Sequence, residues 1–372
     1  MEKKIRVLVV DDSAVMRQLL TEILCADPAI EVVGTAPDPY IARDKIKMLN
    51  PDVLTLDVEM PRMDGLAFLR NLMRLRPMPV VMCSSLTQQG ANVALDALAL
   101  GAIDYVAKPV FDVVHGIKES AQELITKVKM AAQVQVRPLV EAPALNVAQR
   151  HDAGVVLPKR SPPTIFATTE RIVAIGASTG GTEAIKEVLS HLPPDVPGIV
   201  IAQHIPKAFS GPFAIRMNAN SPLNVCEAQD GQPILAGHAY IAPGDRHLMV
   251  VRDGARYRCR LSDGDLVNRH RPSVDVLFRS VAQSAGRNSV GVMLTGMGRD
   301  GAEGLKEMRE AGAATIAQDE ASSVVWGMPG AAWQIGAVQS LHPLQQIAGQ
   351  ILNLAAAPAE PLKNPGVRST NH

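Results

Sequence analysis

The chain has 372 residues, a length that favours two or three domains over a single compact core. Hydrophobic residues make up 47% and charged residues 20% of it, which is the balance of a globular protein and excludes intrinsic disorder. Because 37 Lys and Arg offset 37 Asp and Glu, the chain has no bulk positive field, and we expect it to bind neither nucleic acid nor an anionic membrane surface.

The N-terminus and the cysteines indicate where the protein works. The first residues run directly into a short apolar stretch, Ile5–Val10, which predicts a strand rather than a signal peptide. No segment approaches the roughly 18 uninterrupted apolar residues of a membrane helix, so we expect no membrane insertion. The four cysteines are scattered without metal-ligand spacing, which is typical of a reducing compartment. We therefore expect a cytoplasmic protein.

Residues 1–130 alternate short apolar runs with amphipathic stretches of helical period, the pattern of a parallel sheet wrapped by helices. The sequence predicts two helix N-termini. Asp38–Pro39 is typical of an N-cap followed by proline, and Asp64–Gly65 begins a helix that continues to Leu75. The strands that we predict are Val7–Val10, Glu31–Thr35, Val53–Asp57, Val80–Cys83 and Asp104–Ala107.

Residues 131–169 show no sustained period and contain five prolines among Ala, Gln and Val, which indicates an extended linker. An adapter segment that orders against a domain face is the alternative.

A second α/β domain follows over residues 170–357, and its last helix is expected at Leu344–Ala355. Residues 358–372 are expected to be a disordered tail. The buried strands of the second α/β domain are predicted at Arg171–Ile175, Ile199–Gln203 and Val290–Leu294. Shorter strands around Val225, Tyr240 and Arg258 suggest that its sheet is mixed.

Charged and hydroxyl side chains follow the strands of the first domain. Asp11 and Asp12 follow the first strand, Asp57 ends the third, Ser84 follows the fourth and Lys108 follows the fifth. Because the carboxyl ends of parallel strands lie at one edge, we expect these groups to share a pocket. Three crowded carboxylates repel one another, and Mg²⁺, a hard cation that keeps several waters, relieves this best. For Asp12 alone, a helix N-cap is an equally good interpretation.

An ionised aspartate between a metal ion and a lysine can attack a phosphoryl group, since both cations neutralise the transferring oxygens. These positions, with the segment Asp57–Gly65 and Lys108–Pro109, resemble the receiver domain of two-component response regulators over residues 4–128. The resemblance implies a flavodoxin-like five-stranded parallel sheet and a phosphorylated aspartate. By the resemblance, Asp57 is the phosphoacceptor and, with Asp11 and Asp12, a Mg²⁺ ligand, Ser84 is the switch hydroxyl, Tyr105 is a rotating switch aromatic rather than simple core, and Lys108 senses the phosphate.

In the second domain, the segment Gly176–Gly181 (GASTGG) lies between an apolar strand and a helix that begins near Glu183. Its glycines allow a sharp turn that projects Ser178 outward and leaves backbone N–H groups free near a helix N-terminus. Such a turn suits a serine nucleophile and also suits phosphate binding. The dinucleotide fingerprint and the P-loop lysine are both absent from this turn.

A base and an acid follow on neighbouring strands. His204 ends the next strand, so a parallel neighbour would bring its imidazole to the edge that carries Ser178. Asp300, in the glycine-rich loop Leu294–Gly301, could orient that imidazole. Asp300 as a helix N-cap, and Asp275 or Asp319 as the orienting acid, are the alternatives. The backbone N–H groups of Thr179 and Met297 are candidate oxyanion donors. Equally good positions are lacking for the histidines at 115, 151, 191, 238, 247, 270 and 342.

The string G-x-S-x-G around Ser178 also occurs in the nucleophile elbow of α/β-hydrolases. In those enzymes the acid precedes the histidine in the chain, whereas here His204 precedes Asp300. A different doubly wound hydrolase is therefore indicated.

A receiver followed by these three loops resembles the chemotaxis methylesterase (CheB) family over about residues 4–355. The resemblance implies a flavodoxin-like receiver joined to a doubly wound, mostly parallel α/β esterase domain. It implies a Ser178, His204 and Asp300 triad, lined by Thr179 and Met297. The implied activity is hydrolysis of glutamate methyl esters and deamidation of glutamines on methyl-accepting chemotaxis receptors, activated when a chemotaxis histidine kinase donates phosphate. The esterase half is expected to need no cofactor, and the protein to be a monomer.

Three other functions fit parts of this sequence. A DNA-binding output would need a compact basic helix-turn-helix, and residues 170–355 are too long, too rich in strands and too balanced in charge for it. An inactive adaptor that binds receptors would keep the same fold. A hydrolase for another ester or amide would keep the same loops.

Overall fold

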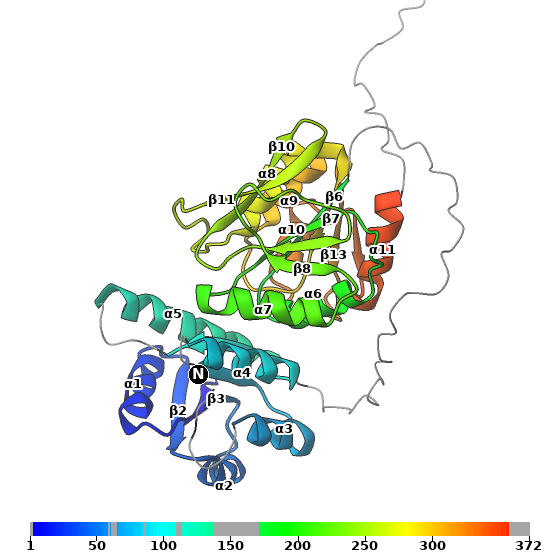
Figure 1. The fold of residues 1–372 in the computed structure, drawn as a ribbon. Helices are drawn as coiled ribbons and strands as arrows, with labels where there is room; N and C mark the ends of the chain where they lie inside the picture. Colours follow the sequence, from blue (N-terminus) through cyan, green and yellow to red (C-terminus); the bar gives the residue numbers. More distant parts are fainter. Residues whose placement is uncertain are drawn as a thin grey trace, which may run out of the picture.

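The computed structural model describes residues 3–58, 60, 65–84, 87–108, 114–134, 136 and 171–356. The expected N-cap Asp64, nearly all of the expected linker and the expected tail at 358–372 lie outside the described residues. Two α/β domains are stacked on each other, the first at the bottom and the second at the top of Figure 1. Within the described part of the chain, no helix is both long and apolar enough to span a bilayer.

The first domain is a five-stranded parallel sheet in the order β2-β1-β3-β4-β5. Its strands β3 and β4 are buried at every residue, because helices cover both faces of the sheet. All five predicted strands are confirmed within a residue or two at their ends. The elements are β1 (Ile5–Val10), α1 (Ala14–Cys25), β2 (Ile30–Ala36), α2 (Pro39–Leu49), β3 (Val53–Asp57), α3 (Gly65–Leu75), β4 (Val80–Ser84), α4 (Gln88–Ala99), β5 (Asp104–Ala107) and α5 (Val114–Ala131).

The second domain has a seven-stranded sheet in the order β14-β13-β12-β6-β7-β9-β8. Its elements are β6 (Ile172–Ala177), α6 (Gly181–Ser190), β7 (Gly198–Gln203), α7 (Lys207–Ala219), β8 (Asn224–Glu227), β9 (His238–Ile241), β10 (His247–Asp253), β11 (Arg256–Ser262), α8 (Val274–Ser284), a 3₁₀ turn η1 (Gly286–Asn288), β12 (Ser289–Met293), α9 (Ala302–Glu310), β13 (Ala314–Gln318), α10 (Met328–Gln334), β14 (Ser340–His342) and α11 (Leu344–Ala356).

The expectation of a mixed sheet is wrong in this domain. Every described pairing of the seven-stranded sheet is parallel, and the antiparallel pair β10–β11 forms a separate ribbon. The predicted strand around Arg258 belongs to that ribbon. The strand β11 alternates exposed and buried residues, which is the pattern of a ribbon with one face in solvent.

Alternate residues of β6 face two different cores, which fixes the strand between helical layers. Val173 and Ile175 pack with α6, α7 and α11, whereas Ile172 and Ala174 pack with α8, α9 and the ribbon. A slip by one residue would exchange the side chains that face these two differently shaped cores, so the packing of both cores opposes it. The carboxyl end of β6 is therefore held in a defined place.

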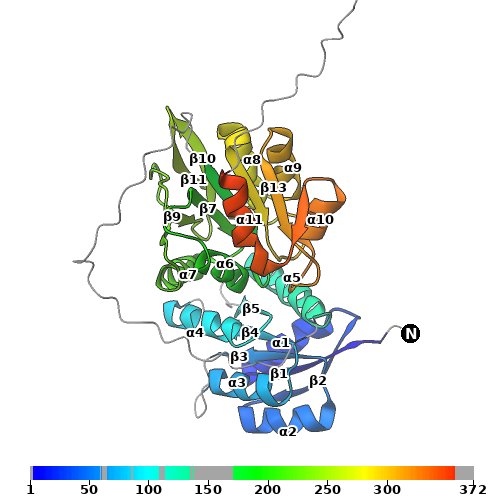
Figure 2. The ribbon, with the colours of Figure 1, turned by 90° about the vertical axis from the view of Figure 1, so that its right-hand side faces the viewer.

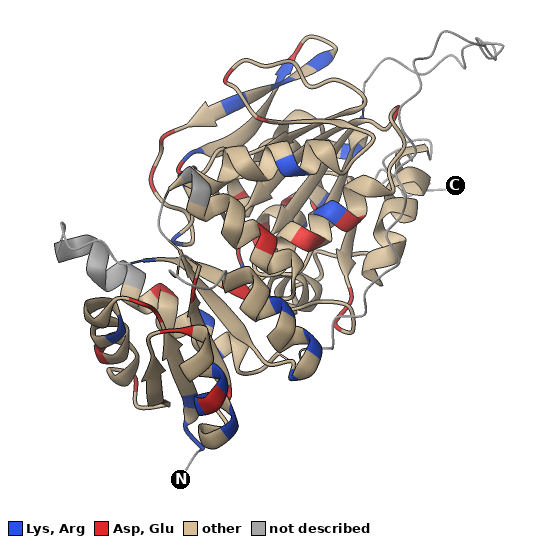
Figure 3. Cartoon of the chain, turned by 60° about the horizontal axis from the view of Figure 1, so that its bottom comes forward, with Lys and Arg blue, Asp and Glu red and all other residues tan. Residues whose placement is uncertain are grey.

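The two domains touch along the side formed by α4 and β5. Helices α4 and α7 lie against each other in both Figures 1 and 2. Arg216 of α7 pairs with Asp96 of α4. Tyr105 of β5 stacks on Phe209 of α7 with ring centroids 4.5 Å apart and planes inclined by 12°. One hydrophobic cluster thus contains buried residues of both domains. On the ribbon, positively and negatively charged positions are interspersed over the two domains (Figure 3).

Candidate functional site

Ser178 lies in the turn between β6 and α6. Gly180 has a left-handed φ of 75°, a conformation that glycine adopts at little cost. At Gly181 the requirement is spatial, because an added Cβ would lie 2.2 Å from Oε1 of Gln203 and 2.7 Å from Cβ of Ala177. The side-chain Nε2 of Gln203 donates to the backbone carbonyl oxygens of Ser178 (2.9 Å) and His204 (3.1 Å). It therefore joins the loop after β6 to the loop after β7.

The structure brings Ser178, His204 and Asp300 into one hydrogen-bonded chain. His204 Nδ1 is 3.1 Å from Ser178 Oγ, and His204 Nε2 is 2.8 Å from Asp300 Oδ2. The side chain of His204 is 8% exposed and that of Asp300 is 2% exposed. If neutral His204 carries its proton on Nε2 and donates it to Asp300, the lone pair of Nδ1 faces the serine hydroxyl. A proton can then pass from hydroxyl to imidazole.

Asp300 is held by groups other than histidine as well. Its carboxylate accepts hydrogen bonds from Ser273 Oγ (2.8 Å), the amide of Val274 (2.7 Å) and Asn268 Nδ2 (2.7 Å). Burial, the largest influence, raises its pKa, but the hydrogen bond and charge of His204 together with these donors outweigh burial. The pKa of Asp300 therefore lies below its usual value, and the side chain is ionised at neutral pH.

The two alternative acids do not contact the imidazole. The carboxylate of Asp275 accepts hydrogen bonds from Asn268 (2.7 Å) and the amide of Gly304 (2.6 Å), and burial raises its pKa. Asp319 accepts hydrogen bonds from Ser322 on another loop. The N-cap residue of α9 is Gly301, so Asp300 does not cap that helix.

Two residues behind the site were not found from the sequence. The sequence gives His270 no position at a strand end, yet its ring stacks on that of His204 with centroids 3.6 Å apart and planes inclined by 11°. Burial, followed by the charge of His204, lowers the pKa of His270 to about 4. Asn268 lies two residues earlier and joins Asp300 to Asp275. Neither residue ends a predicted strand, so the argument from strand ends could not reach them.

Thr179 directly follows Ser178, and Met297 lies in the loop that follows β12. Within the described residues, the backbone N–H of neither residue donates a hydrogen bond, so both are free to receive a developing oxyanion. The hydroxyl of Thr179 donates to Asp104 Oδ2 of the first domain at 2.5 Å. Met297 packs against a hydrophobic cluster of that same domain. The first domain thus covers the residues beside the serine.

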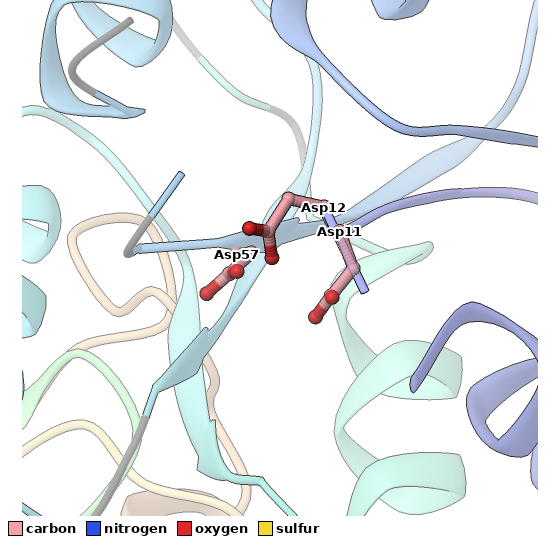
Figure 4. Close-up of side chains that lie close together, drawn as sticks. All are labelled: Asp11, Asp12 and Asp57. Atoms are coloured by element: carbon pink, nitrogen blue, oxygen red, sulfur yellow. The ribbon is translucent and has the colours of Figure 1, made fainter. Parts of the chain in front are cut away.

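The acidic residues of the first domain also come together. One carboxylate oxygen from each of Asp11, Asp12 and Asp57 lies within 4.8 Å of the others. Figure 4 shows the three side chains close together. Asp11 and Asp57 are fully buried, and Lys108 Nζ lies 3.1 Å from Asp11 Oδ2 and 2.8 Å from Asp57 Oδ2. Burial lowers the pKa of Lys108, but the two carboxylates raise it further than burial lowers it. One ammonium cannot balance three carboxylates, so this donor set fits a divalent cation such as Mg²⁺.

The remaining predicted switch residues lie on β4 and β5. Ser84 is buried at the end of β4. Tyr105 is 5% exposed, and besides stacking on Phe209 it has Lys127 Nζ 5.1 Å from its ring centroid. Burial, with the nearby acids, raises the pKa of Tyr105 well above its usual value, so the phenol is neutral. Whether this ring rotates stays a prediction.

Each of the two domains matches a known protein family. Residues 7–127 match the response regulator receiver domain model, and residues 173–351 match the CheB methylesterase model. A relative from Xanthomonas campestris is 58% identical, covers 96% of this chain and 99% of its own, and is named protein-glutamate methylesterase/protein-glutamine glutaminase 1. A relative from Hydrogenovibrio crunogenus with the same enzyme name is 55% identical over 94% and 99%. The crystal structure of the Thermotoga maritima CheB methylesterase catalytic domain is 35% identical and covers 50% of this chain and 99% of its own, with a TM-score of 0.49.

The packing around the serine turn is tested by Gly181→Ala. We expect the free energy of unfolding to fall by about 1–3 kcal/mol, because the new Cβ overpacks against Gln203 and Ala177. Gly349→Ala in α11 is the matched control, since nothing lies within 4 Å of its Cβ and no proline follows it, and should stabilise by about 0.5–1 kcal/mol. Fluorescence of the chain's two tryptophans, both in the second domain, follows each transition. Equal effects of the two substitutions would contradict the account.

The buried, neutral state of His270 makes stability depend on pH. An unfolded histidine has a pKa of about 6.5, and that of folded His270 is about 4. Between these values the unfolded chain binds a proton that the folded chain lacks, so stability falls as the pH is lowered through this window. When the pH is lowered from 7.5 to 4.5, we expect the free energy of unfolding, measured in urea, to fall less for His270→Phe than for wild type. Equal falls in the two proteins would show that folding does not lower the pKa of His270.

Proposed function

This chain belongs to the CheB methylesterase family, and on that premise we propose that it hydrolyses glutamate methyl esters, and deamidates glutamines, on methyl-accepting chemotaxis receptors. The high-identity relatives are named for both activities. The observation that supports the proposal most directly is the hydrogen-bonded chain of Ser178, His204 and Asp300. Removing methyl groups from receptors in this way adapts a chemotaxis signal.

The proposed reaction begins with Ser178. Its Oγ attacks the side-chain carbonyl carbon of the substrate while His204 Nδ1 takes the hydroxyl proton. Ionised Asp300 stabilises the imidazolium through Nε2. The negative oxygen of the tetrahedral intermediate accepts hydrogen bonds from the N–H groups of Thr179 and Met297.

The intermediate collapses when the carbon–oxygen bond to the methoxy group breaks, and His204 donates its proton to form methanol. For a glutamine substrate the carbon–nitrogen bond breaks and ammonia leaves. His204 then takes a proton from water as the water oxygen attacks the acyl carbon. The bond between that carbon and Ser178 Oγ breaks, His204 returns the proton to Oγ, and glutamate is released. Each of these steps uses side chains and backbone groups of this chain, so we propose that the esterase half needs no cofactor.

We propose that Asp57 accepts phosphate from a chemotaxis histidine kinase. Asp11, Asp12 and Asp57 would hold Mg²⁺, which when bound supplies positive charge to the transferring phosphoryl oxygens. Lys108 supplies a second positive charge to the same oxygens, because its ammonium already contacts Asp57. We also infer that the protein acts as a cytoplasmic monomer, which sedimentation of the purified chain and cell fractionation test.

We propose that the unphosphorylated first domain blocks substrate entry. Asp104 accepts a hydrogen bond from Thr179, next to the nucleophile, and Tyr105 stacks on Phe209. A protein helix carrying the substrate cannot reach Ser178 while these contacts hold. Phosphorylation activates the enzyme if phosphoaspartate favours a packing in which they are broken.

Methanol release from methyl-labelled receptor membranes tests the activity. Wild type should release methanol, and acetyl phosphate with Mg²⁺ should raise the rate. Ser178→Ala should lower the rate by about 10⁴-fold or more, because no other group replaces the nucleophile. Asp57→Asn should keep the basal rate and lose the stimulation. Absence of methanol from wild type under every condition would instead favour an inactive adaptor or a hydrolase for another ester.

The blocking contact is tested by exchanging the charges of an ion pair between the domains. Arg216→Asp places two carboxylates opposite each other and should raise the unphosphorylated rate about two- to fivefold, the range expected for one exposed pair. Adding Asp96→Arg restores an opposite pair and should return the rate to the wild-type level. An unphosphorylated rate that does not change in the single variant would count against occlusion by this packing.

A further inference from the structure

A tight turn lies behind the proposed catalytic side chains. Val267 and His270 exchange two backbone hydrogen bonds, of 3.1 and 2.9 Å, around Asn268 and Arg269. Asn268 has a φ of 52° and Arg269 a φ of 68°, so both are left-handed, as in a type I′ hairpin turn. The turn thereby directs the side chains of its second and fourth residues toward the same hydrogen-bonded chain.

Asn268 acts on the acid. Its amide nitrogen donates one hydrogen bond to Asp300 Oδ1 and one to Asp275 Oδ2, both at 2.7 Å. An amide NH₂ has two hydrogens, so this arrangement uses both of them. Two neighbouring carboxylates would otherwise repel each other. The Asn268 amide nitrogen lies between the two carboxylates and offsets their repulsion. It also fixes the direction in which Asp300 points its Oδ2 at His204.

His270 acts on the base. Its ring covers one face of the His204 imidazole, nearly parallel to it and 3.6 Å away between centroids. The hydrogen bonds to Ser178 and Asp300 fix two atoms of the His204 ring while the serine is free. Once Ser178 is acylated, its hydroxyl hydrogen is gone and one of these bonds is lost. The stacked ring remains and still restricts rotation of the imidazole.

We propose that the Val267–His270 turn is a positioning element of the esterase site, in which Asn268 orients Asp300 and His270 holds the plane of the His204 ring. The proposal rests on the proposed hydrolase function. Neither side chain needs to touch substrate. Both act through the acid and the base, and His270 contributes most after the acyl group has formed.

The first test is His270→Ala in the full-length protein, phosphorylated with acetyl phosphate and assayed by methanol release. We expect kcat to fall by about 10–100-fold, the scale of a small misplacement of a reacting group, with KM unchanged within about twofold. His270→Phe keeps a flat ring that can stack on the imidazolium and should stay within about threefold of wild type. A structural role alone would not separate these two variants in kcat while sparing KM.

The position of the slow step gives a second measurement. Methanol leaves during acylation, so slow deacylation produces a burst of up to one methanol per enzyme before the steady rate. We expect a larger burst for His270→Ala than for wild type. If His270→Ala unfolds at the assay temperature, His270→Leu decides by the same criteria, because it fills the space without an aromatic face. A normal kcat in the variant that folds would overturn the role of His270.

Asn268→Asp tests the acid. It keeps the size of the side chain and tolerates a left-handed φ, but it replaces the NH₂ donor with a third carboxylate. We expect kcat to fall by at least about tenfold. Arg269→Gly is the matched control, since it lies in the same turn at a φ that suits glycine, and should leave kcat unchanged. Equal kcat values for Asn268→Asp and wild type would overturn the role of Asn268.

Failure of this proposal and failure of the proposed function can be told apart. If wild type releases methanol and Ser178→Ala does not, the hydrolase function stands whatever the turn variants do. If wild type releases none, the function itself fails. Loss of kcat in Arg269→Gly as large as in Asn268→Asp would mean that the turn only supports the fold, which would also overturn the proposal.

Discussion

The register of three adjacent parallel strands is the constraint on which the second domain depends. Ala177 of β6 pairs with Gln203 of β7, and Gly176 pairs with Met293 of β12. The residues that follow therefore lie level at one edge, where the Ser178 amide donates to the carbonyl of Thr295 (3.0 Å) and the His204 amide donates to that of Ala177 (3.2 Å). A hydroxyl and an imidazole come within hydrogen-bonding distance because backbone pairing delivers them there. A one-residue slip would exchange the side chains of β6 that face the two cores, so the packing on both sides of the sheet preserves the register.

The first domain also gathers side chains at the carboxyl edge of a parallel sheet, for a different chemistry, and its strand β5 contacts the second domain. The strand ends beside Lys108, which contacts Asp57 and Asp11. Its other end carries Asp104 and Tyr105, which contact Thr179 and Phe209 of the second domain. A four-residue strand thus lies between the acidic pocket and the surface that covers the serine. A change of charge at Asp57 has a short physical route to that surface, through Lys108 and the packing of Tyr105.

The carboxyl ends of parallel strands meet at one edge of a sheet, and this explains both which site residues the sequence predicts and which it misses. Asp57, Ser178 and His204 each follow or end a short apolar run, so their meeting at a sheet edge could be argued without coordinates. The glycines around Ser178 and before Asp300 add a local signal. Asn268 and His270 follow an irregular segment after β11, where no period indicates which way a side chain points. Contacts between domains, such as Tyr105 with Phe209, join segments with no shared sequence pattern. The separate β10–β11 ribbon was missed because a short strand alone does not reveal its partner.

The central claim is that the hydrogen-bonded chain at this edge makes Ser178 a nucleophile. Covalent labelling with a fluorophosphonate, followed by intact mass and peptide mapping of the acid-quenched protein, tests it most directly. We expect one label per chain, attached to Ser178, with a labelling rate that falls by about 10²-fold or more in His204→Ala. Label on another residue, or a Ser178 labelling rate that does not depend on His204, would contradict it.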